Sequence, residues 1–429
     1  MIGYADGRAA AEALDRDDEF AALRERFYVQ EGVYYMDGNS LGLLSRDAEQ
    51  ALLHALDEWK TLGIDGWLNA DPPWFYLGEE LGKRMAHMVG AEPDEVVVTG
   101  GTTVNLHALV ATFYEPVDGR RKIIVNELDF PSDIYALEAQ IAGRGGEPER
   151  DLVKVRSRDG RTIHRDDVAA AMNDDVALVL LPSVLYRSGQ LFDIEAITRA
   201  AHARGIPVGW DCCHSAGSVP HRFDEWNVDF AFWCNYKYLN AGPGSVGALY
   251  VNRKHFDRQP ALPGWWGYDK DRQFDMSHEW QGAAGAGAWQ MSTLSILSAA
   301  PLLGSLRIFD EIGIERVRAR SLALTDYMLA LIEESGLTAA PYSYAIGTPR
   351  DHAQRGGHVA VEHPSGAQIN AALKSRGVIP DFRPPNVVRL APIPLYTSFA
   401  DIWDTVAILR DVVDSGEYQH QSDRRGVVA

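Results

Sequence analysis

Residues 210–214, Trp-Asp-Cys-Cys-His, and residues 233–242, Trp-Cys-Asn-Tyr-Lys-Tyr-Leu-Asn-Ala-Gly, decide the fold of this chain. Each stretch lies at the end of an apolar run. The first run ends in a carboxylate, Asp211, which His214 follows, and the second ends in Lys237 at a glycine-rich turn. Short apolar runs bounded by turn residues are typical of strands buried on both faces of a parallel sheet. The sequence therefore predicts that Asp211, His214 and Lys237 lie where two buried strands end.

These three side chains match the chemistry of a pyridoxal 5'-phosphate site. A lysine amine can hold the cofactor aldehyde as a Schiff base, and a carboxylate beside the pyridine nitrogen favours its protonated form. A single Lys or Asp at a strand end is usually structural, and a single His is usually a satisfied surface residue. The combination favours a cofactor site, with His214 as an orienting hydrogen-bond partner of Asp211.

Apolar strands alternate with helices through the middle of the chain. We expect strands at 95–99, 122–126, 152–155, 176–181, 206–210, 230–234 and 246–251. We expect helices at 75–89, from 103, after 131 and at 194–204. This alternation predicts an α/β fold with a largely parallel central sheet covered by helices, whose ligand lies at the carboxyl ends of the strands.

The flanking regions predict a second, smaller α+β domain. Before the sheet we expect a charged helix at 9–28, a short strand at 33–36 and a helix at 47–62. An irregular stretch at 256–292 precedes helical periodicity at 294–334, and strands at 358–362 and 387–390 then alternate with helices at 367–376 and 399–413. The predicted domains are an N-terminal segment joining the small domain (1–65), a large cofactor-binding domain (66–300), a small C-terminal domain (301–415) and a polar tail (416–429).

Charge and composition exclude several classes of partner. The 429-residue chain has a formal charge of −19, whereas nucleic acids and anionic membranes require a basic face. No apolar run reaches the length of a membrane span, and the first residues lack the basic-then-apolar order of a signal peptide. Three cysteines, two of them adjacent, fit reduced, buried thiols rather than a disulfide framework or a zinc site. We expect a cytoplasmic protein whose ligand is a small molecule.

A glycine turn and an aromatic residue extend the predicted site. Gly100-Gly101-Thr102-Thr103 links a strand to a helix, where backbone N–H groups and hydroxyls bind phosphate well, although a simple helix cap would look the same. Phe130 ends another strand region and could stack on a cofactor ring or pack in the core. GxGxxG and GxxxxGK[ST] are absent, which counts against a dinucleotide oxidoreductase or a nucleotide hydrolase.

Arg389 is the one basic residue in an apolar strand late in the chain. Such a residue needs an anionic partner, which is either a substrate carboxylate or a structural ion pair. His352, His358 and His363 lie close together in the sequence but lack metal-ligand spacing, so we interpret them as unrelated surface residues and predict no catalytic metal.

The chain resembles the kynureninases, which are fold type I pyridoxal phosphate enzymes of the aspartate aminotransferase superfamily. The most specific shared motifs are Gly38-Asn39-Ser40-Leu41-Gly42-Leu43, Tyr236-Lys237-Tyr238-Leu239-Asn240-Ala241-Gly242 and Arg389-Leu390-Ala391-Pro392-Ile393-Pro394-Leu395-Tyr396. The Asp211-to-His214 spacing is shared more widely across the superfamily. Further matching words are Thr103 to His107, Phe130-Pro131-Ser132-Asp133, Gly189-Gln190, Val228 to Ala231 and Gly264-Trp265.

The resemblance implies a role for each matching residue. Lys237 would bind the cofactor covalently, Asp211 would pair with the pyridine nitrogen and His214 would lie beside it. Thr102, Thr103 and Tyr236 would hold the phosphate, and Phe130 would stack on the ring with Asp133 nearby. The family forms homodimers with shared active sites, in which Trp265 and Thr293 would complete the phosphate site of the neighbouring subunit. Arg389 and Ser40 would bind the substrate, with Arg389 on its α-carboxylate.

Two positions bear on the substrate. At Trp67 and Thr293 the chain is similar to bacterial relatives that select kynurenine, whereas animal relatives selective for 3-hydroxykynurenine carry His and Asn. A bulky indole leaves less room and no good partner for a ring hydroxyl. The resemblance therefore implies hydrolysis of L-kynurenine, and weaker hydrolysis of 3-hydroxy-L-kynurenine, with Lys237, Tyr236 and Asp211 as the catalytic residues.

Other functions stay open. An aminotransferase would share the same lysine and aspartate, and a catalytically silent pyridoxal phosphate-binding protein would share the fold. A cysteine desulfurase needs a nucleophilic Cys on a later mobile loop, and no Cys follows Cys234.

Overall fold

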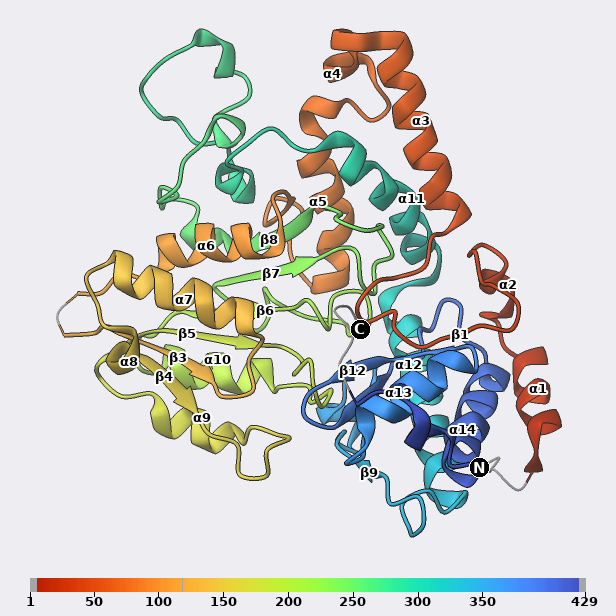
Figure 1. Ribbon diagram of the computed structural model, residues 1–429. Helices are drawn as coiled ribbons and strands as arrows, with labels where there is room; N and C mark the ends of the chain where they lie inside the picture. Colours follow the sequence, from red (N-terminus) through yellow and green to blue (C-terminus); the bar gives the residue numbers. More distant parts are fainter. Residues whose placement is uncertain (1–5, 118, 424–429) are drawn as a thin grey trace.

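A seven-stranded sheet forms the centre of the larger part of the molecule, which is known from a computed structural model that describes residues 6–117 and 119–423 (Figure 1). The strand order is β2-β8-β7-β6-β5-β3-β4. β8 runs antiparallel to both of its neighbours, and the pairs β7–β6, β6–β5, β5–β3 and β3–β4 are parallel. The strands are β2 (Val96–Val98), β3 (Lys122–Asn126), β4 (Leu152–Val155), β5 (Val176–Pro182), β6 (Val208–Asp211), β7 (Phe230–Cys234) and β8 (Gly247–Val251). The predicted α/β class and largely parallel sheet are confirmed.

Both faces of this sheet are apolar because alternate residues of each strand point to opposite sides. Ile123 and Val125 pack into one cluster with helices α6 (Thr102–Phe113) and α7 (Pro131–Gly143). Ile124, between them, packs into the cluster on the other side. That second side is covered by α5 (Leu77–Val89), α9 (Arg165–Ala171), α10 (Ile194–His202) and α11 (Ile296–Ile312), and the short α8 (Pro148–Asp151) leads into β4. The carboxyl ends of β5, β6 and β7 therefore meet at one edge, where a ligand can bind.

A second sheet lies beside the first (Figure 1). Its antiparallel order is β12-β13-β10-β9, and a separate parallel pair joins β1 to β11. These strands are β1 (Tyr34–Tyr35), β9 (Ala345–Ile346), β10 (Val359–Glu362), β11 (Val378–Ile379), β12 (Asp381–Arg383) and β13 (Val387–Leu390). Helices α1 (Arg8–Arg16), α12 (Ile314–Glu334), α13 (Gly366–Ser375) and α14 (Phe399–Asp414) pack around a core of their own. We propose this unit as the small domain, which α1 and β1 join from the N-terminal segment.

The remaining helices form one end of the molecule. α3 (Arg46–Leu62) packs along α11, and α4 (Gly66–Asn69) follows it. Residues 256–292 beside them follow the 3₁₀ turn η4 (Arg253–His255) and contain the short 3₁₀ turns η5 (Trp265–Gly267), η6 (Gln273–Asp275) and η7 (Gly285–Trp289), in agreement with the irregular stretch expected there. None of the helices in the described residues combines the length and the apolar character needed to cross a membrane.

Two local expectations were wrong, one for a helix and one for a histidine. The charged helix expected at 9–28 is two helices, α1 and α2 (Ala21–Arg24), because the Asp18 side chain accepts a hydrogen bond from the Phe20 N–H at 2.9 Å and turns the chain. Residues 417–420 of the predicted polar tail form a 3₁₀ turn, and residues 424–429 lie outside the described part. His358, expected at the surface, is completely buried at the start of β10. The prediction of buried, reduced thiols is confirmed for all three cysteines.

Candidate active site

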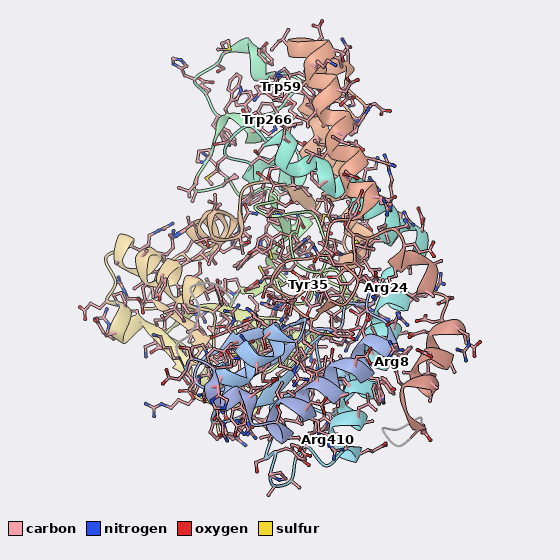
Figure 2. The ribbon with its side chains drawn as sticks, turned by 45° about the vertical axis from the view of Figure 1, so that its right-hand side comes forward. Arg8, Arg24, Tyr35, Trp59, Trp266 and Arg410 are labelled. Atoms are coloured by element: carbon pink, nitrogen blue, oxygen red, sulfur yellow. The ribbon has the colours of Figure 1, made fainter. Side chains whose placement is uncertain are left out.

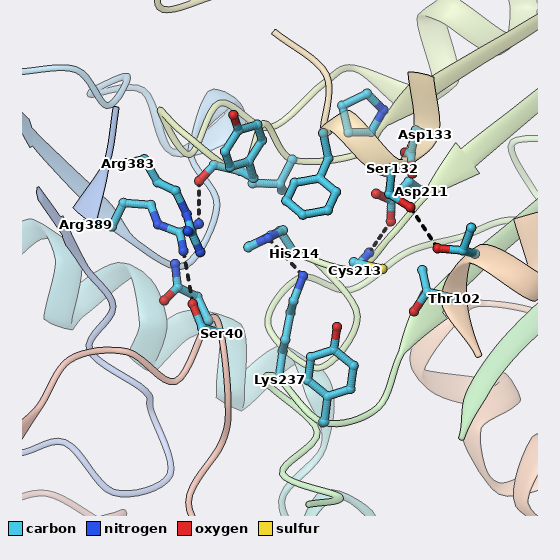
Figure 3. Close-up of a pocket in the computed structure, with 17 residues that line it drawn as sticks. Ser40, Thr102, Ser132, Asp133, Asp211, Cys213, His214, Lys237, Arg383 and Arg389 are labelled. Carbon is cyan, nitrogen blue, oxygen red and sulfur yellow. Dashed lines mark hydrogen bonds between the residues drawn. The ribbon is translucent and has the colours of Figure 1, made fainter. Parts of the chain in front are cut away.

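A cavity of about 230 Å³ lies between the two sheets at the carboxyl ends of the central strands. Ten of the residues predicted for the site line this cavity: Ser40, Thr102, Thr103, Phe130, Asp133, Asp211, His214, Tyr236, Lys237 and Arg389. Figure 3 shows Lys237 and His214 in the middle, with Arg383, Arg389 and Ser40 on one side and Asp133, Asp211 and Thr102 on the other. The cavity therefore has a basic end, formed mainly by the small sheet, and an acidic end at the large sheet.

Lys237 and His214 contact each other at the centre. β7 ends at Cys234, and the turn that follows aims the Lys237 amine into the cavity. The amine donates a hydrogen bond to Nε2 of His214 at 3.0 Å. Burial, followed by the positive charge of Lys237, lowers the pKa of His214 well below its usual value. His214 is therefore a neutral acceptor that orients the lysine, whereas the sequence predicted it as a partner of Asp211.

Three buried carboxyl groups gather at the acidic end. Asp211 ends β6, Asp129 lies just before α7, and Asp133 lies in the first turn of α7. Burial raises the pKa of Asp129 to about 8. Burial and the neighbouring charge of Asp211 raise the pKa of Asp133 well above its usual value, and the two carboxyl groups share a hydrogen bond. The raised pKa values favour the protonated forms of Asp129 and Asp133, because this end of the cavity brings carboxyl groups together with few positive groups to offset them.

Hydroxyl groups cluster beside these acids at a helix N-terminus. α6 begins at Thr102 after Gly100 and Gly101, and Gly100 has a φ of 55°, a left-handed conformation that glycine adopts without strain. The Thr103 hydroxyl lies 2.8 Å from the Ser132 hydroxyl. Free backbone N–H groups at a helix start and nearby hydroxyls suit a phosphate group. The site predicted at the glycine turn is thus formed by residues on two helices.

Arg389 occupies the basic end and is almost completely buried. It forms an ion pair with Asp381, donates to the Tyr186 carbonyl at 2.8 Å and donates to the Ser40 hydroxyl at 3.0 Å. Burial lowers the pKa of Arg389 to about 10, which leaves the guanidinium charged at neutral pH. The sequence left two partners open for Arg389, a substrate carboxylate and a structural ion pair. The two are compatible, because Arg389 pairs with Asp381 and also lines the cavity.

Three predicted residues lie outside the cavity of this chain. Trp67 packs against Trp74 and Trp266, with ring centroids 5.9 Å and 5.4 Å apart. Trp265 and Thr293 are exposed. Trp67 and Trp265 belong to the end of the molecule formed by α3, α4 and residues 256–292, and Thr293 follows directly after that segment. A role of these residues at the site would require a second subunit.

The sequence analysis missed several residues near the cavity. Asn39, Ser132, Tyr186, Cys213 and Arg383 also line it. Asn39, Ser132 and Cys213 are neighbours of predicted residues and could have been found from the shared motifs. The buried His358 lies behind His214, with ring centroids 6.1 Å apart. Arg383 lies in β12, a strand of three residues that is too short to produce a periodic signal.

The acidic end fits a bound pyridinium group. One carboxylate oxygen of Asp133 and one of Asp129 are buried without a hydrogen-bond partner among the described residues. Buried carboxyl groups in this state are costly unless a cationic donor approaches them. A protonated pyridine nitrogen supplies both the charge and the N–H, and the hydroxyls of Thr103 and Ser132 are placed for a phosphate.

Solved structures of other proteins share this fold. The cysteine desulfurase of Thermococcus onnurineus NA1 matches with a TM-score of 0.77 at 18% identity, covering 92% of this chain and 98% of that chain. A variant of the protein C-DES, with glycine covalently linked to its PLP cofactor, matches with a TM-score of 0.76 at 19% identity, covering 90% and 99%. At these identities the likeness concerns the fold alone. Fold and site together define a fold type I pyridoxal phosphate enzyme.

Relatives in sequence specify the family. Kynureninase of Bacillus thuringiensis subsp. konkukian (strain 97-27) is 54% identical over 415 residues, which cover 97% of this chain and 96% of the relative. Kynureninase of Geobacillus thermodenitrificans (strain NG80-2) is 53% identical over 419 residues, covering 98% and 97%. The family model described as the kynureninase C-terminal domain matches residues 317–409. The chain belongs to the kynureninase family.

Proposed function

We propose that this chain hydrolyses L-kynurenine to anthranilate and L-alanine with pyridoxal phosphate as its cofactor. The observation that carries the proposal is the Lys237 amine at 3.0 Å from a neutral His214, inside a cavity with carboxylates at one end and arginines at the other. An amino-acid substrate has an amine and a carboxylate that match this order. Its carboxylate suits Arg389, and its amine then lies toward Lys237.

The cofactor would be held by groups on three elements. Asp211 at the end of β6 would pair with the pyridine nitrogen, and Thr102, Thr103 and Tyr236 would hold the phosphate, since all four residues line the cavity. Phe130 would stack on the ring; its own ring packs edge-on against Tyr186, with centroids 5.3 Å apart. When bound, pyridoxal phosphate accepts the electron pair released at the α-carbon of the substrate.

The residues of the chain then manage protons and water. Lys237 takes the α-proton of the substrate, and His214 holds the lysine amine in position. Burial raises the pKa of Tyr236, so its phenol stays protonated and can donate a proton to the side-chain oxygen or to the alanine carbon. One water molecule adds to the side-chain ketone, and the bond between the β- and γ-carbons breaks to release anthranilate.

We also propose a homodimer. Several large apolar side chains at the α3–α4 end are exposed: Leu53, Trp59, Ile64, Leu68, Trp265, Phe274 and Met276. Trp59 is 60% exposed, and Figure 2 shows it at the same end as Trp266. So many exposed large apolar side chains at one end of the molecule favour a protein interface there. In such a dimer, Trp67, Trp265 and Thr293 would reach the neighbouring site, and Trp67 would favour L-kynurenine over its 3-hydroxy form. The buried free thiols are in keeping with a cytoplasmic enzyme.

One assay tests the main proposal. The purified, cofactor-loaded protein is incubated with L-kynurenine and separately with 3-hydroxy-L-kynurenine, and the fluorescent product is followed. We expect anthranilate and alanine in equal amounts, with a higher kcat/KM for L-kynurenine. Amino-group exchange with a 2-oxo acid and no anthranilate would instead identify an aminotransferase. A spectral change on binding L-kynurenine without turnover would identify a silent binding protein.

A second measurement tests the dimer. Light scattering of the purified protein should give about twice the 47.4 kDa mass of the chain. Replacing Trp59 by Ser, far from the cavity of its own chain, should shift the equilibrium toward the monomer. A monomeric wild-type protein with full activity would contradict the shared site.

A further inference from the structure

The pairing of β12 with β13 places one carboxylate between two arginines. Asp381 lies directly opposite Arg389 in this antiparallel pair, so their side chains stand on the same face. Arg383 lies two residues beyond Asp381 in β12, which puts it on that face as well. Asp381 is therefore flanked by both arginines that line the cavity.

One oxygen of Asp381 contacts three side chains at the basic end of the cavity. Its Oδ2 atom forms the ion pair with Arg389, a second ion pair with Arg383 at 2.8 Å, and a hydrogen bond from the Ser40 hydroxyl at 2.9 Å. Arg389 in turn donates to Ser40 at 3.0 Å. The four side chains form a closed network in which moving Asp381 would move every other member.

The members of this network differ in burial. The side chains of Asp381 and Arg389 are 0% and 1% exposed, whereas that of Arg383 is 30% exposed. Holding Arg389 charged at this depth requires a counter-charge. Asp37, the other carboxyl near Arg389, is largely buried, and its pKa is raised above the usual value by burial. With two guanidinium groups around Asp381, the wall of the cavity keeps a positive surplus toward the ligand.

We propose that Asp381 is a positioning residue, which fixes the guanidinium groups of Arg389 and Arg383 so that both face the α-carboxylate of the amino-acid substrate. The inference rests on the proposed function, because it needs an amino acid as the ligand. Asp381 does not touch the substrate. It holds Arg389 in one orientation, so that the carboxylate meets donors that are already aligned.

The test replaces the charge of Asp381 and keeps its shape. Asp381→Asn is compared with Glu362→Gln, a matched control in the neighbouring strand β10. Glu362 is also buried and pairs with an arginine, Arg161, at 2.8 Å, but it does not line the cavity. For each cofactor-loaded protein, absorbance titrations give the dissociation constants of L-alanine and of L-alaninamide, which lacks the carboxylate.

Asp381→Asn should weaken L-alanine binding by about tenfold and change L-alaninamide binding by less than about twofold. KM for L-kynurenine should rise by a similar factor, with a smaller change in kcat. Glu362→Gln should leave both ligands unchanged. Equal weakening of both ligands, or no weakening of L-alanine, would overturn the proposal, because a purely structural ion pair gives no discrimination between a carboxylate and its amide.

A second variant covers the case in which Asp381→Asn does not fold. Ser40→Ala removes two hydrogen bonds of the same network, to Asp381 and from Arg389, and should weaken L-alanine binding by about threefold without affecting L-alaninamide binding; no difference between the two ligands would overturn the inference. The proposed function fails separately, if the wild-type protein forms no anthranilate, since the alanine titrations do not depend on turnover.

Discussion

Two buried carboxylate sites lie at opposite ends of the same central strands, and they are built in opposite ways. At the carboxyl end of β6, Asp211 lies with Asp133 and Asp129, whose pKa values are raised and whose outer oxygens lack partners among the described residues. At the amino end of β7, Asp229 accepts from His202, His255 and the backbone N–H of Val208 at 2.7–2.8 Å. Carboxylate oxygens of the first group lack partners that a cationic ligand would supply. Asp229 in the second group has its partners within the chain.

The difference separates function from stability. Burial would raise the pKa of Asp229, but its hydrogen bonds to His202 and His255 and the nearby Lys254 hold it well below the usual value. Asp229 and its partners, here called the Asp229 clamp, therefore stabilise the folded state at neutral pH. This contribution is lost as the pH falls. The three carboxyl groups at the other end, Asp129, Asp133 and Asp211, are here called the acidic trio, and they have the opposite effect on stability. Bringing them together raises the free energy of the folded state, and a bound pyridinium would offset this cost.

The largest expected effect comes from the lysine at the functional end. Lys237→Ala should reduce anthranilate formation by roughly 1,000-fold or more, because the group that moves the α-proton is gone. Its melting temperature in the cofactor-free form should change little. Lys254→Ala is the matched control at the other end, where loss of the 2.9 Å ion pair to Asp229 should lower stability and leave kcat unchanged. Undiminished turnover in Lys237→Ala would refute its role.

The next largest effect is expected on stability, from a change of Asp229 in the clamp. Asp229→Asn removes the negative charge that His202, His255 and Lys254 share and should lower the free energy of unfolding by about 3 kcal/mol. Urea denaturation of the cofactor-free protein measures this change. The kcat of the folded variant should match the wild type, and a catalytic defect at full cofactor occupancy would show that the two ends are coupled.

The sequence predicted the acidic end and the centre of the cavity better than its basic end. Asp211 ends β6, and His214 and Lys237 follow β6 and β7. Both strands are apolar runs buried along their whole length, so the place of these residues at one edge of the sheet follows from the parallel topology. Thr102 and Phe130 were found for the same reason. Asp381 and Arg383 were missed because β12 has only three residues and lies between Pro380 and Pro384, which leaves no alternating pattern to read.

The burial and the position of residues that depend on tertiary contacts could not be predicted from the sequence either. His358 was interpreted as a surface residue because the histidines around it lack metal-ligand spacing, but it is completely buried, and Gly189 packs against it. Trp67, Trp265 and Thr293 were assigned by resemblance, and their distance from the cavity of their own chain is a property of the assembled fold. The position of Asp229 carried no signal, since its partners come from α10 and from the segment after β8.

Asp211→Asn tests whether the acidic end is built for a cation. Removing the charge beside the pyridine nitrogen should lower kcat/KM by about 100-fold, which corresponds to about 2.7 kcal/mol. The cofactor-free variant should be as stable as the wild type or more stable, because the repulsion within the trio is relieved. Destabilisation comparable to that of Asp229→Asn would mean that Asp211 is a structural residue, and the contrast between the two sites would disappear.

The smallest expected effect is a pH dependence at Asp129. Its pKa is raised to about 8 in the folded protein from an ordinary value of 3.8, so the folded state retains a proton that the unfolded state releases. The resulting stability is complete at acidic pH and is lost as the pH rises toward 8. Between about pH 7 and about pH 9, the cofactor-free wild type should therefore lose about 1–2 kcal/mol more stability than Asp129→Asn. Denaturation curves at the two pH values measure the difference; identical losses would show that Asp129 is already ionised and that the trio carries its full negative charge without a ligand.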